Sequence, residues 1–179
     1  MNPKVTKMIV KYPEDQIPNI IIPTQYKPYR YLIGKDGRKP LVALCMNPSA
    51  ANDDTSDKTV NKVIRISKEL HYDGWFVVNI YPERATKVSN LGKFDEKLSN
   101  ENIGVIEDFL LDRKIKEVWG AWGNLKSGTL RKGKKMMSAM LKKHKIKVFH
   151  FADVTTNGEP RHPLYLTVVK ENKREYVIE

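Results

Sequence analysis

The sequence predicts an α/β fold, a three-layer α/β/α sandwich built on a mostly parallel central sheet of four strands. Four apolar stretches rich in β-branched or aromatic residues recur along the chain, and stretches with apolar residues at helical spacing lie between them. Three of the four are near-continuous apolar runs, which are typical of parallel strands covered on both faces. Strand and helix alternate three times, so we expect right-handed crossovers and helices on both faces of the sheet.

The expected strands span residues 41–46, 75–80, 116–121 and 146–151. Between the first two, Asp57 is a candidate N-cap and Gly74 follows a helical stripe made of Val60, Val63, Ile64, Ser67 and Leu70. The next interval carries a second stripe, made of Leu98, Val105, Ile106, Phe109 and Leu110. A weaker third stripe, interrupted by Gly133, contains Leu130, Met137, Met140 and Leu141.

The first forty residues have a different character, because four prolines break them into short extended pieces at 20–22 and 29–33. We expect an N-terminal antiparallel appendage over residues 1–40, followed by the core over 41–179, all in one domain. The stretch Gly34-Lys35-Asp36-Gly37 has hairpin-turn chemistry and is expected to deliver the chain into the first core strand.

Composition excludes several classes of protein. A chain of 179 residues with 40% apolar and 30% charged residues has the composition of a soluble globular domain. Cys45 is the single cysteine, which excludes an internal disulfide and indicates a reducing, cytoplasmic compartment. No apolar run approaches the roughly 20 residues that a membrane span requires, and the N-terminus Met1-Asn2-Pro3-Lys4 lacks the apolar stretch of an export signal.

Cofactors and metals are not expected. His71, His144 and His150 lack the mutual spacing of a metal cluster, and the chain has no glycine fingerprint for a nucleotide phosphate. We therefore predict a protein with no metal and no cofactor, and we expect a monomer.

The net charge of +11 is unevenly distributed. Residues 113–147 contain twelve basic side chains and one acid, Glu117. A one-sided basic block suits a polyanion, so DNA is the expected partner; a solvated, lysine-rich helix face is the alternative. The expected DNA contacts are Arg84, Lys126, Arg131, Lys132, Lys134, Lys135 and Arg161.

Polar, aromatic and proline residues follow each expected strand. Ligands of open α/β sheets bind outside the carboxyl ends of the strands, so these residues are expected at one rim. They are Asn47-Pro48-Ser49, Asn79 with Tyr81-Pro82, Trp122-Gly123, and a late segment that leads from Thr155 to Arg161-His162-Pro163-Leu164-Tyr165.

The order of these motifs resembles the family of domains of unknown function numbered 1643. The resemblance spans roughly residues 29–166. It rests on Asn47-Pro48-Ser49, Asp57-x-Thr59, Val77-Val78-Asn79, Arg84-Ala85-Thr86, Ala121-Trp122-Gly123 and the run from Arg161 to Leu166.

A more distant resemblance is to the uracil-DNA glycosylases, which have a parallel four-stranded α/β/α sheet with functional residues at these strand ends. Asn47-Pro48 is similar to their first motif, Asn79 to the asparagine that recognises the flipped base, and His162-Pro163 to their late loop. Two departures concern the pocket: Cys45-Met46 stands where that motif has a glycine frame, and Leu164 where those enzymes have serine.

The resemblance implies hydrolysis of the bond between a base and its deoxyribose. Asn47 would hold the attacking water, with Asp54 or Asp57 as a source of a carboxylate. His162, as a neutral donor, would stabilise the oxygen of the departing base. Asn79 carries a donor and an acceptor that suit a pyrimidine edge.

Further substrate contacts are expected around these residues. Tyr81 would stack on the extruded base, and Leu164, Tyr165 or Leu166 would fill the gap left in the duplex. Pro48, Ser49, Trp122 and Gly123 complete the expected substrate-binding set. Uracil is the base suggested by analogy, and a bulkier, hypermodified base of viral DNA, with a role in defence against phage, stays open.

Each assignment has a structural alternative. Asn47-Pro48 would be an Asx turn, Asp57 a helix cap, and Asn79 a brace for the Tyr81-Pro82 turn. Trp122-Gly123 would provide packing and backbone clearance, and His162 would belong to the core. Two other functions also stay open: a non-catalytic binder of nucleic acid or nucleotide, and a hydrolase of free nucleosides or nucleotides.

Overall fold

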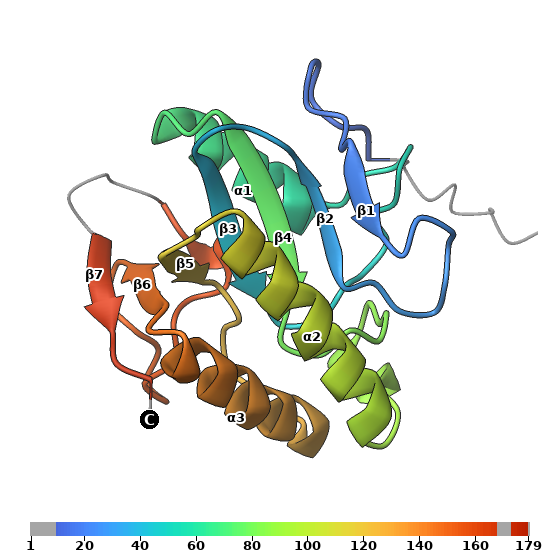
Figure 1. Cartoon of the computed structure of the whole chain (residues 1–179), viewed down its shortest axis with the longest axis vertical. Helices are drawn as coiled ribbons and strands as arrows, with labels where there is room; N and C mark the ends of the chain where they lie inside the picture. The colour runs from blue at the N-terminus through green and yellow to red at the C-terminus, as the bar shows by residue number, and fades with distance from the viewer. Residues whose placement is uncertain (1–9, 168–172, 179) are drawn as a thin grey trace, which may run out of the picture.

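The computed structural model describes residues 10–167 and 173–178, so the expectation about an export signal at the N-terminus lies outside the described residues. A seven-stranded mixed sheet forms its centre, in the order β1-β2-β4-β3-β5-β6-β7 (Figure 1). The strands are β1 Ile20–Ile22, β2 Leu32–Lys35, β3 Pro40–Cys45, β4 Gly74–Asn79, β5 Glu117–Gly120, β6 Lys147–Phe151 and β7 Lys173–Tyr176.

The four expected strands are the middle four of this sheet, and they run parallel as β4, β3, β5 and β6. The expected sheet of four strands is nevertheless too small, because β1, β2 and β7 extend it through antiparallel pairs. Within the expected N-terminal appendage, residues 20–22 and 32–35 are therefore strands of this same sheet, and they pair antiparallel as predicted. Strand β7 has the sequence Lys-Arg-Glu-Tyr, which lacks the apolar pattern from which a strand is predicted.

The segment after β2 is a crossover and not the expected hairpin turn. Gly34 and Lys35 still belong to β2, and β4 separates β2 from β3. The chain therefore passes over the start of β4, where a Cβ on Gly74 would lie 2.7 Å from the carbonyl oxygen of Lys35. The carboxylate of Asp73 accepts the backbone N–H groups of Arg38 and Lys39, which fixes the crossing.

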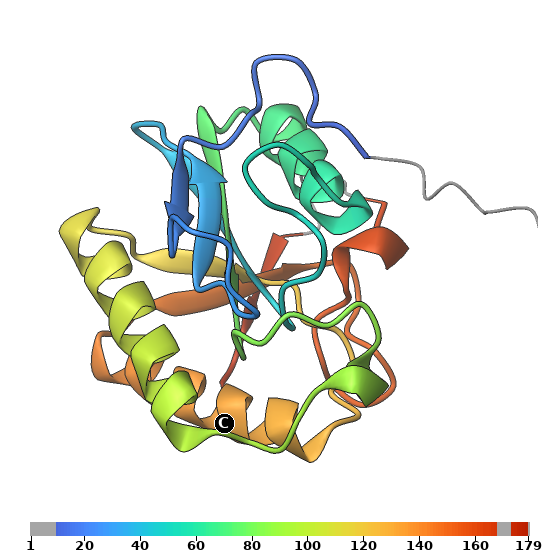
Figure 2. The ribbon, with the colours of Figure 1, turned by 90° about the vertical axis from the view of Figure 1, so that its right-hand side faces the viewer.

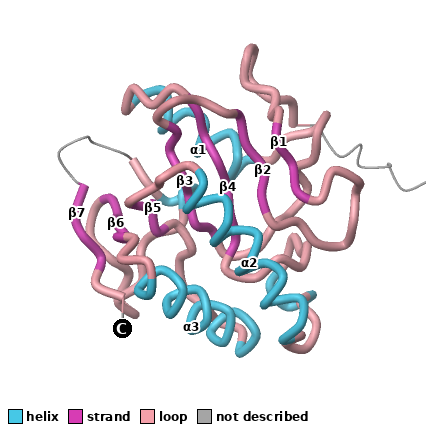
Figure 3. Tube along the Cα trace, viewed as in Figure 1, coloured by secondary structure: helices cyan, strands magenta, loops and turns pink. Residues whose placement is uncertain are grey.

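Helices cover both faces of the sheet, as the sequence predicts. Helix α1 (Lys58–Glu69) lies behind the sheet, and α2 (Glu96–Asp112) and α3 (Gly128–Lys143) lie in front of it (Figures 1 and 3). Figure 2 shows the layers from the side, with α1 separated by the sheet from α2 and α3. Asp57 caps α1 by accepting the N–H of Val60 at 2.9 Å, which confirms the predicted cap.

Two apolar clusters fill the spaces on either side of the sheet. Val42 and Leu44 of β3 pack with α2 and α3, whereas Leu41, Ala43 and Cys45 pack with α1. This alternation, with a period of two residues, decides which side chains at the end of a strand reach which layer. Among the described residues, no helix combines the length and the apolar character needed to cross a bilayer.

Glycine in α3 brings this helix close to the end of β4. A Cβ on Gly133 would lie 2.9 Å from the carbonyl oxygen of Ile80, the residue after β4. Gly104, in α2, has no atom within 4 Å of the corresponding Cβ position.

The two glycines predict opposite effects of the same substitution. Gly104→Ala should raise the free energy of unfolding by about 0.5–1 kcal/mol, since alanine is the better helix former. Gly133→Ala should lower it by about 1–3 kcal/mol, because α3 has to move away from β4. Urea denaturation of both variants measures the difference, and equal stabilisation of both would contradict this account of α3.

Candidate functional site

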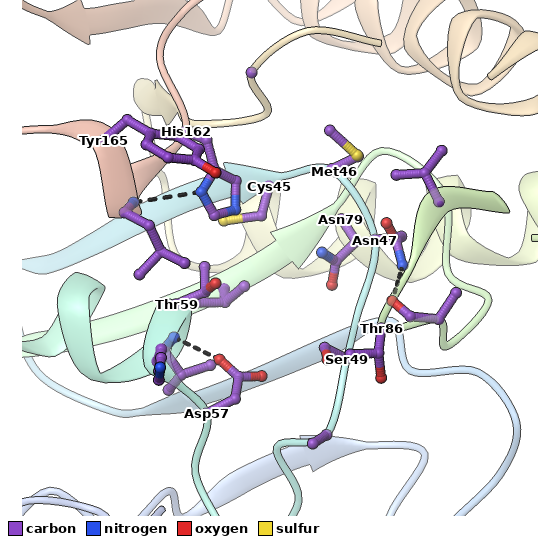
Figure 4. Close-up of a pocket in the computed structure, with 18 of the residues that line it drawn as sticks. Cys45, Met46, Asn47, Ser49, Asp57, Thr59, Asn79, Thr86, His162 and Tyr165 are labelled. Atoms are coloured by element: carbon purple, nitrogen blue, oxygen red, sulfur yellow. Dashed lines mark hydrogen bonds between the residues drawn. The ribbon is translucent and has the colours of Figure 1, made fainter. Parts of the chain in front are cut away.

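A cavity of about 1290 Å³ opens at the carboxyl ends of the parallel strands, on the α1 face of the sheet. Its wall comes from the segment after β3, the N-terminus of α1, the end of β4 and the loop before η2 (Pro163–Tyr165) (Figure 4). The structure brings Asn47, Asn79 and His162 together in this wall although they are far apart along the chain. Ser49, Asp57, Gly123, Leu164 and Tyr165 also line the cavity.

Asn79 ends β4, and its side chain is buried on the α1 face. Its amide nitrogen and its amide oxygen both lack a hydrogen-bond partner within the described part of the chain. The amide therefore does not brace the Tyr81-Pro82 turn, the structural alternative for this residue. A buried amide without partners costs free energy unless a ligand or water supplies them, so Asn79 is available to a ligand.

Asn47 has a double role. Its Nδ2 donates to the carbonyl oxygens of Ala85, at 2.9 Å, and Pro48, at 3.1 Å, so the amide ties the segment after β3 to the segment after β4. The side-chain oxygen is the atom left for a ligand or a water molecule. An Asx turn would require the side-chain oxygen of Asn47 to accept the N–H of Ser49, and the bonds of this amide within the described residues are instead donated by Nδ2.

His162 is held in one tautomer. Its Nδ1 accepts the N–H of Leu164 at 3.3 Å, so the neutral ring carries its proton on Nε2. Burial lowers the pKa of His162, and the nearby charge of Asp57 opposes this to a smaller extent. The ring is therefore neutral at pH 7 and offers Nε2–H as a donor.

Gly123 makes room for His162. Its φ of +68° is in the left-handed region, and a Cβ on it would lie 3.1 Å from the Cβ of His162. Its N–H donates to the carbonyl oxygen of Pro160 at 2.9 Å, which ties the end of β5 to the loop before His162. Gly123 therefore provides the backbone clearance that the sequence analysis gave as its alternative role.

The carboxylate of Asp57 is occupied by the backbone. Its Oδ1 caps Val60, and its Oδ2 accepts the N–H of Ala51 at 3.3 Å. Asp57 is the one carboxylate among the described residues that line the cavity. Asp54, the other expected source of a carboxylate, is an exposed residue outside the cavity wall.

Three expected substrate-binding residues lie outside the cavity wall. Pro48 is buried. Tyr81 packs in the cluster with α2 and α3, and its hydroxyl accepts the N–H of Asp95 at 3.0 Å. The expectation that Tyr81 stacks on a base is therefore wrong. The indole of Trp122 is in the same cluster and donates to Glu159 at 2.6 Å, so it provides packing.

The late loop presents apolar side chains at the mouth of the cavity. Leu164 is 45% exposed and Tyr165 is 79% exposed, and both line the cavity. Leu166 is buried in the cluster with α1, so it is not available to enter a duplex. Of the three side chains expected to fill the gap in the duplex, Leu164 and Tyr165 are therefore the two that are exposed.

Comparison with known families agrees with the sequence motifs. A family model described as "protein of unknown function (DUF1643)" matches residues 30–164. The chain belongs to this family. The matched segment contains the residues of the cavity wall from Arg30 to Leu164. No curated protein and no solved structure matches the chain.

The seven basic residues expected to contact DNA have different surroundings in this DUF1643 protein. Lys126 and Arg161 line the cavity, and Lys132 and Lys135 are exposed on α3. Three others make contacts within the protein. Arg84 donates to the carbonyl oxygens of Lys27, Ser49 and Ala51, and Arg131 donates to those of Leu125 and Lys126. Lys134 forms an ion pair with Glu159 at 2.7 Å. These contacts use part of the hydrogen-bonding capacity of the three side chains, and Arg161 likewise donates from Nε to the carbonyl oxygen of Asp153 at 2.8 Å. The expected DNA contacts stay predictions.

The sequence analysis missed Arg30, Thr86 and Asn124, which line the same cavity. Arg30 lies in the extended stretch 29–33, and a charged residue in an otherwise apolar stretch was the available signal. Cys45 also lines the cavity, and burial raises the pKa of its thiol to about 12, so the sulfur stays protonated.

The lowered pKa of His162 predicts an acid-sensitive fold. Below about pH 6.5 the unfolded chain takes up the histidine proton before the folded protein does, so the free energy of unfolding falls as the pH drops. His162→Gln should reduce this dependence. Urea denaturation between pH 5 and pH 8 measures it, and His71→Asn, at an exposed position with positive φ, is the control that should leave it unchanged.

Proposed function

We propose that this protein is a DNA glycosylase-like hydrolase, which accepts a flipped pyrimidine-type base in the cavity and hydrolyses its N-glycosidic bond. The observation that carries the proposal is the buried amide of Asn79, which lacks partners within the described residues and lines the same cavity as the neutral imidazole of His162. A planar base edge with one donor and one acceptor would satisfy both amide atoms. The order of these residues after parallel strands supports the resemblance to uracil-DNA glycosylases.

The reaction breaks the bond between C1′ of the sugar and the base nitrogen, and the bonding electrons leave with the base. The sugar becomes oxocarbenium-like, water attacks C1′ and loses a proton to solvent, and the departing base anion takes up a proton from solvent. The catalyst therefore needs a positioned water and a hydrogen-bond donor for the departing base. The free oxygen of Asn47 would orient the water, and Nε2–H of His162 would donate to an oxygen of the base. An amide is a weak base, so we expect slow chemistry.

The side chains at the rim of the cavity support nucleic acid as the partner. Leu164 and Tyr165 are exposed where a flipped base would leave the duplex, and they would occupy its place in the stack. Lys126 and Arg161 would bind the flanking phosphates. A hypermodified base of viral DNA is a candidate substrate, with a role in defence against phage.

A second candidate is a non-catalytic binder of nucleic acid or nucleotide that uses the same cavity. It is favoured by Asp57, whose two oxygens both accept backbone N–H groups and so are not free to activate water. A hydrolase of free nucleosides would use the same residues, and its turnover would be unaffected by competing duplex.

Base release is the decisive measurement. Duplex and single-stranded oligonucleotides carrying uracil, uracil-5-carboxylate, thymine, cytosine, hydroxymethylcytosine and glucosylated hydroxymethylcytosine are incubated with the protein and tested for alkali-labile abasic sites. His162→Ala and Asn47→Ala should each reduce turnover by about 100-fold or more while changing DNA affinity much less. Asn90→Ala, at an exposed position in η1 (Val88–Asn90), is the control.

The outcomes separate the candidates. If the folded protein releases no base from any substrate, the enzyme proposal fails. A loss of ligand affinity in Asn47→Ala, with no turnover in the parent protein, would establish the binder instead.

DNA affinity should depend steeply on salt through the cavity rim. Replacing both Lys126 and Arg161 with alanine should reduce the slope of log K against log salt by about 1–2. Lys143→Ala is the control, because Lys143 pairs with Glu107 at the far end of α3. Equal slopes for the parent protein, the double variant and Lys143→Ala would show that Lys126 and Arg161 do not bind phosphates.

A further inference from the structure

The floor of the cavity contains a concentration of unsatisfied polar atoms. Seven buried side-chain nitrogen or oxygen atoms lack a hydrogen-bond partner in the described residues, and three of them belong to Arg30 and Asn79. Both residues line the cavity, and both side chains are about 1% exposed. Since native proteins satisfy nearly all buried polar groups, this concentration indicates a bound partner rather than a packing defect.

The guanidinium of Arg30 is poorly compensated. Its Nη1 donates to the carbonyl oxygen of Ala51 at 2.7 Å, while its Nε has no partner among the described residues. Burial lowers the pKa of Arg30 to about 10, so the group stays charged at pH 7. A buried charge with one neutral acceptor is costly unless a counter-charge approaches it.

The surroundings of Arg30 leave an excess of positive charge. Arg84 donates to the same carbonyl oxygen of Ala51 at 2.9 Å, which puts two guanidinium groups side by side. Asp57 is the neighbouring carboxylate, and both its oxygens are bound to backbone N–H groups. Burial keeps Cys45 and Tyr12 protonated by raising the pKa of each, so neither adds a negative charge at pH 7.

The N-terminus of α1 adds to this potential. Lys58, Thr59 and Val60, the first turn of this twelve-residue helix, line the same cavity. The N-terminal end of a helix carries a partial positive charge, which stabilises an anion nearby. Asp57 already accepts the N–H of Val60, so the terminus offers an anion the N–H groups of Lys58 and Thr59. This terminus and the Nε of Arg30, which lacks a partner among the described residues, are independent features, and both favour a negatively charged group.

We propose that Arg30 and the first turn of α1 form an oxyanion subsite at the floor of the cavity, which binds a carboxylate or a phosphate of the ligand beside the heterocycle recognised by Asn79. In the enzyme, the substrate would be a pyrimidine with an acidic substituent, and this part of the inference rests on the proposed function. In a protein that acts on free nucleotides, the same subsite would bind the phosphate. The guanidinium fork suits both groups through paired N–H···O bonds.

Calorimetric titration with three probes tests the subsite: uracil, uracil-5-carboxylate and inorganic phosphate. Uracil-5-carboxylate should bind at least about tenfold more tightly than uracil, because a charge-assisted hydrogen bond forms in a desolvated site. Arg30→Gln should abolish that difference while retaining the weak affinity for uracil, and Arg30→Lys should retain part of it. Arg65→Gln, on the exposed face of α1, is the matched control.

A measurement on the parent protein guards against a misfolded Arg30→Gln variant. The ¹⁵N–¹H signal of Arg30 Nε should shift on titration with uracil-5-carboxylate and stay in place with uracil. Phosphate that shifts the same signal and binds as tightly as uracil-5-carboxylate would support the subsite and assign it to a nucleotide phosphate. Equal affinities for uracil and uracil-5-carboxylate, with no shift of the Arg30 signal by any anion, would overturn it.

The two proposals fail separately. Base excision from DNA without any preference for an anion would leave the proposed function standing and remove the subsite. Anion binding through Arg30 in a protein that releases no base would do the reverse.

Discussion

The backbone of Ala51 connects the segments that form the cavity. Its carbonyl oxygen accepts Arg30 from the segment before β2 and Arg84 from the segment after β4, and its N–H donates to Asp57 at the start of α1. One residue in the loop after β3 thus connects four parts of the chain that approach the cavity from different directions. The arrangement places the half-buried Arg84 beside the buried Arg30, and this proximity gives the floor of the cavity its positive charge.

The middle of the fold could be predicted from sequence because burial determines its residue pattern. Apolar runs mark β3, β4, β5 and β6, and the stripes of α1, α2 and α3 follow the helical period. The flanking strands were harder to predict. Strand β7 has a polar sequence and is stabilised by pairing with β6. Strand β2 pairs with β4, and the crossover that connects β2 to β3 contains turn residues that resemble those of a hairpin.

The candidate site was predictable to the extent that strand ends determine it. Asn47, Asn79 and His162 reach one cavity because each follows or ends an element at the same edge of the sheet. Tyr81 packs with α2 and α3 beside its neighbour Ile80, because the alternation of faces ends with β4. Trp122 packs on the same side because the alternation of β5 continues past the strand: Trp119 and Ala121 face α1, whereas Val118 and Trp122 do not. Arg30 comes before a strand, and the antiparallel direction of β2 brings it to the same edge.

Glu159 connects the loop that carries His162 to strand β7 at the edge of the sheet. Its carboxylate accepts the indole N–H of Trp122, pairs with Lys134 of α3 and accepts the hydroxyl of Tyr176 in β7 at 3.3 Å. Glu159 precedes Pro160, whose carbonyl oxygen accepts the N–H of Gly123 beside His162. Strand β7 is in this way an anchor for the loop that carries the imidazole, so removal of β7 would loosen His162 in the cavity wall without touching it.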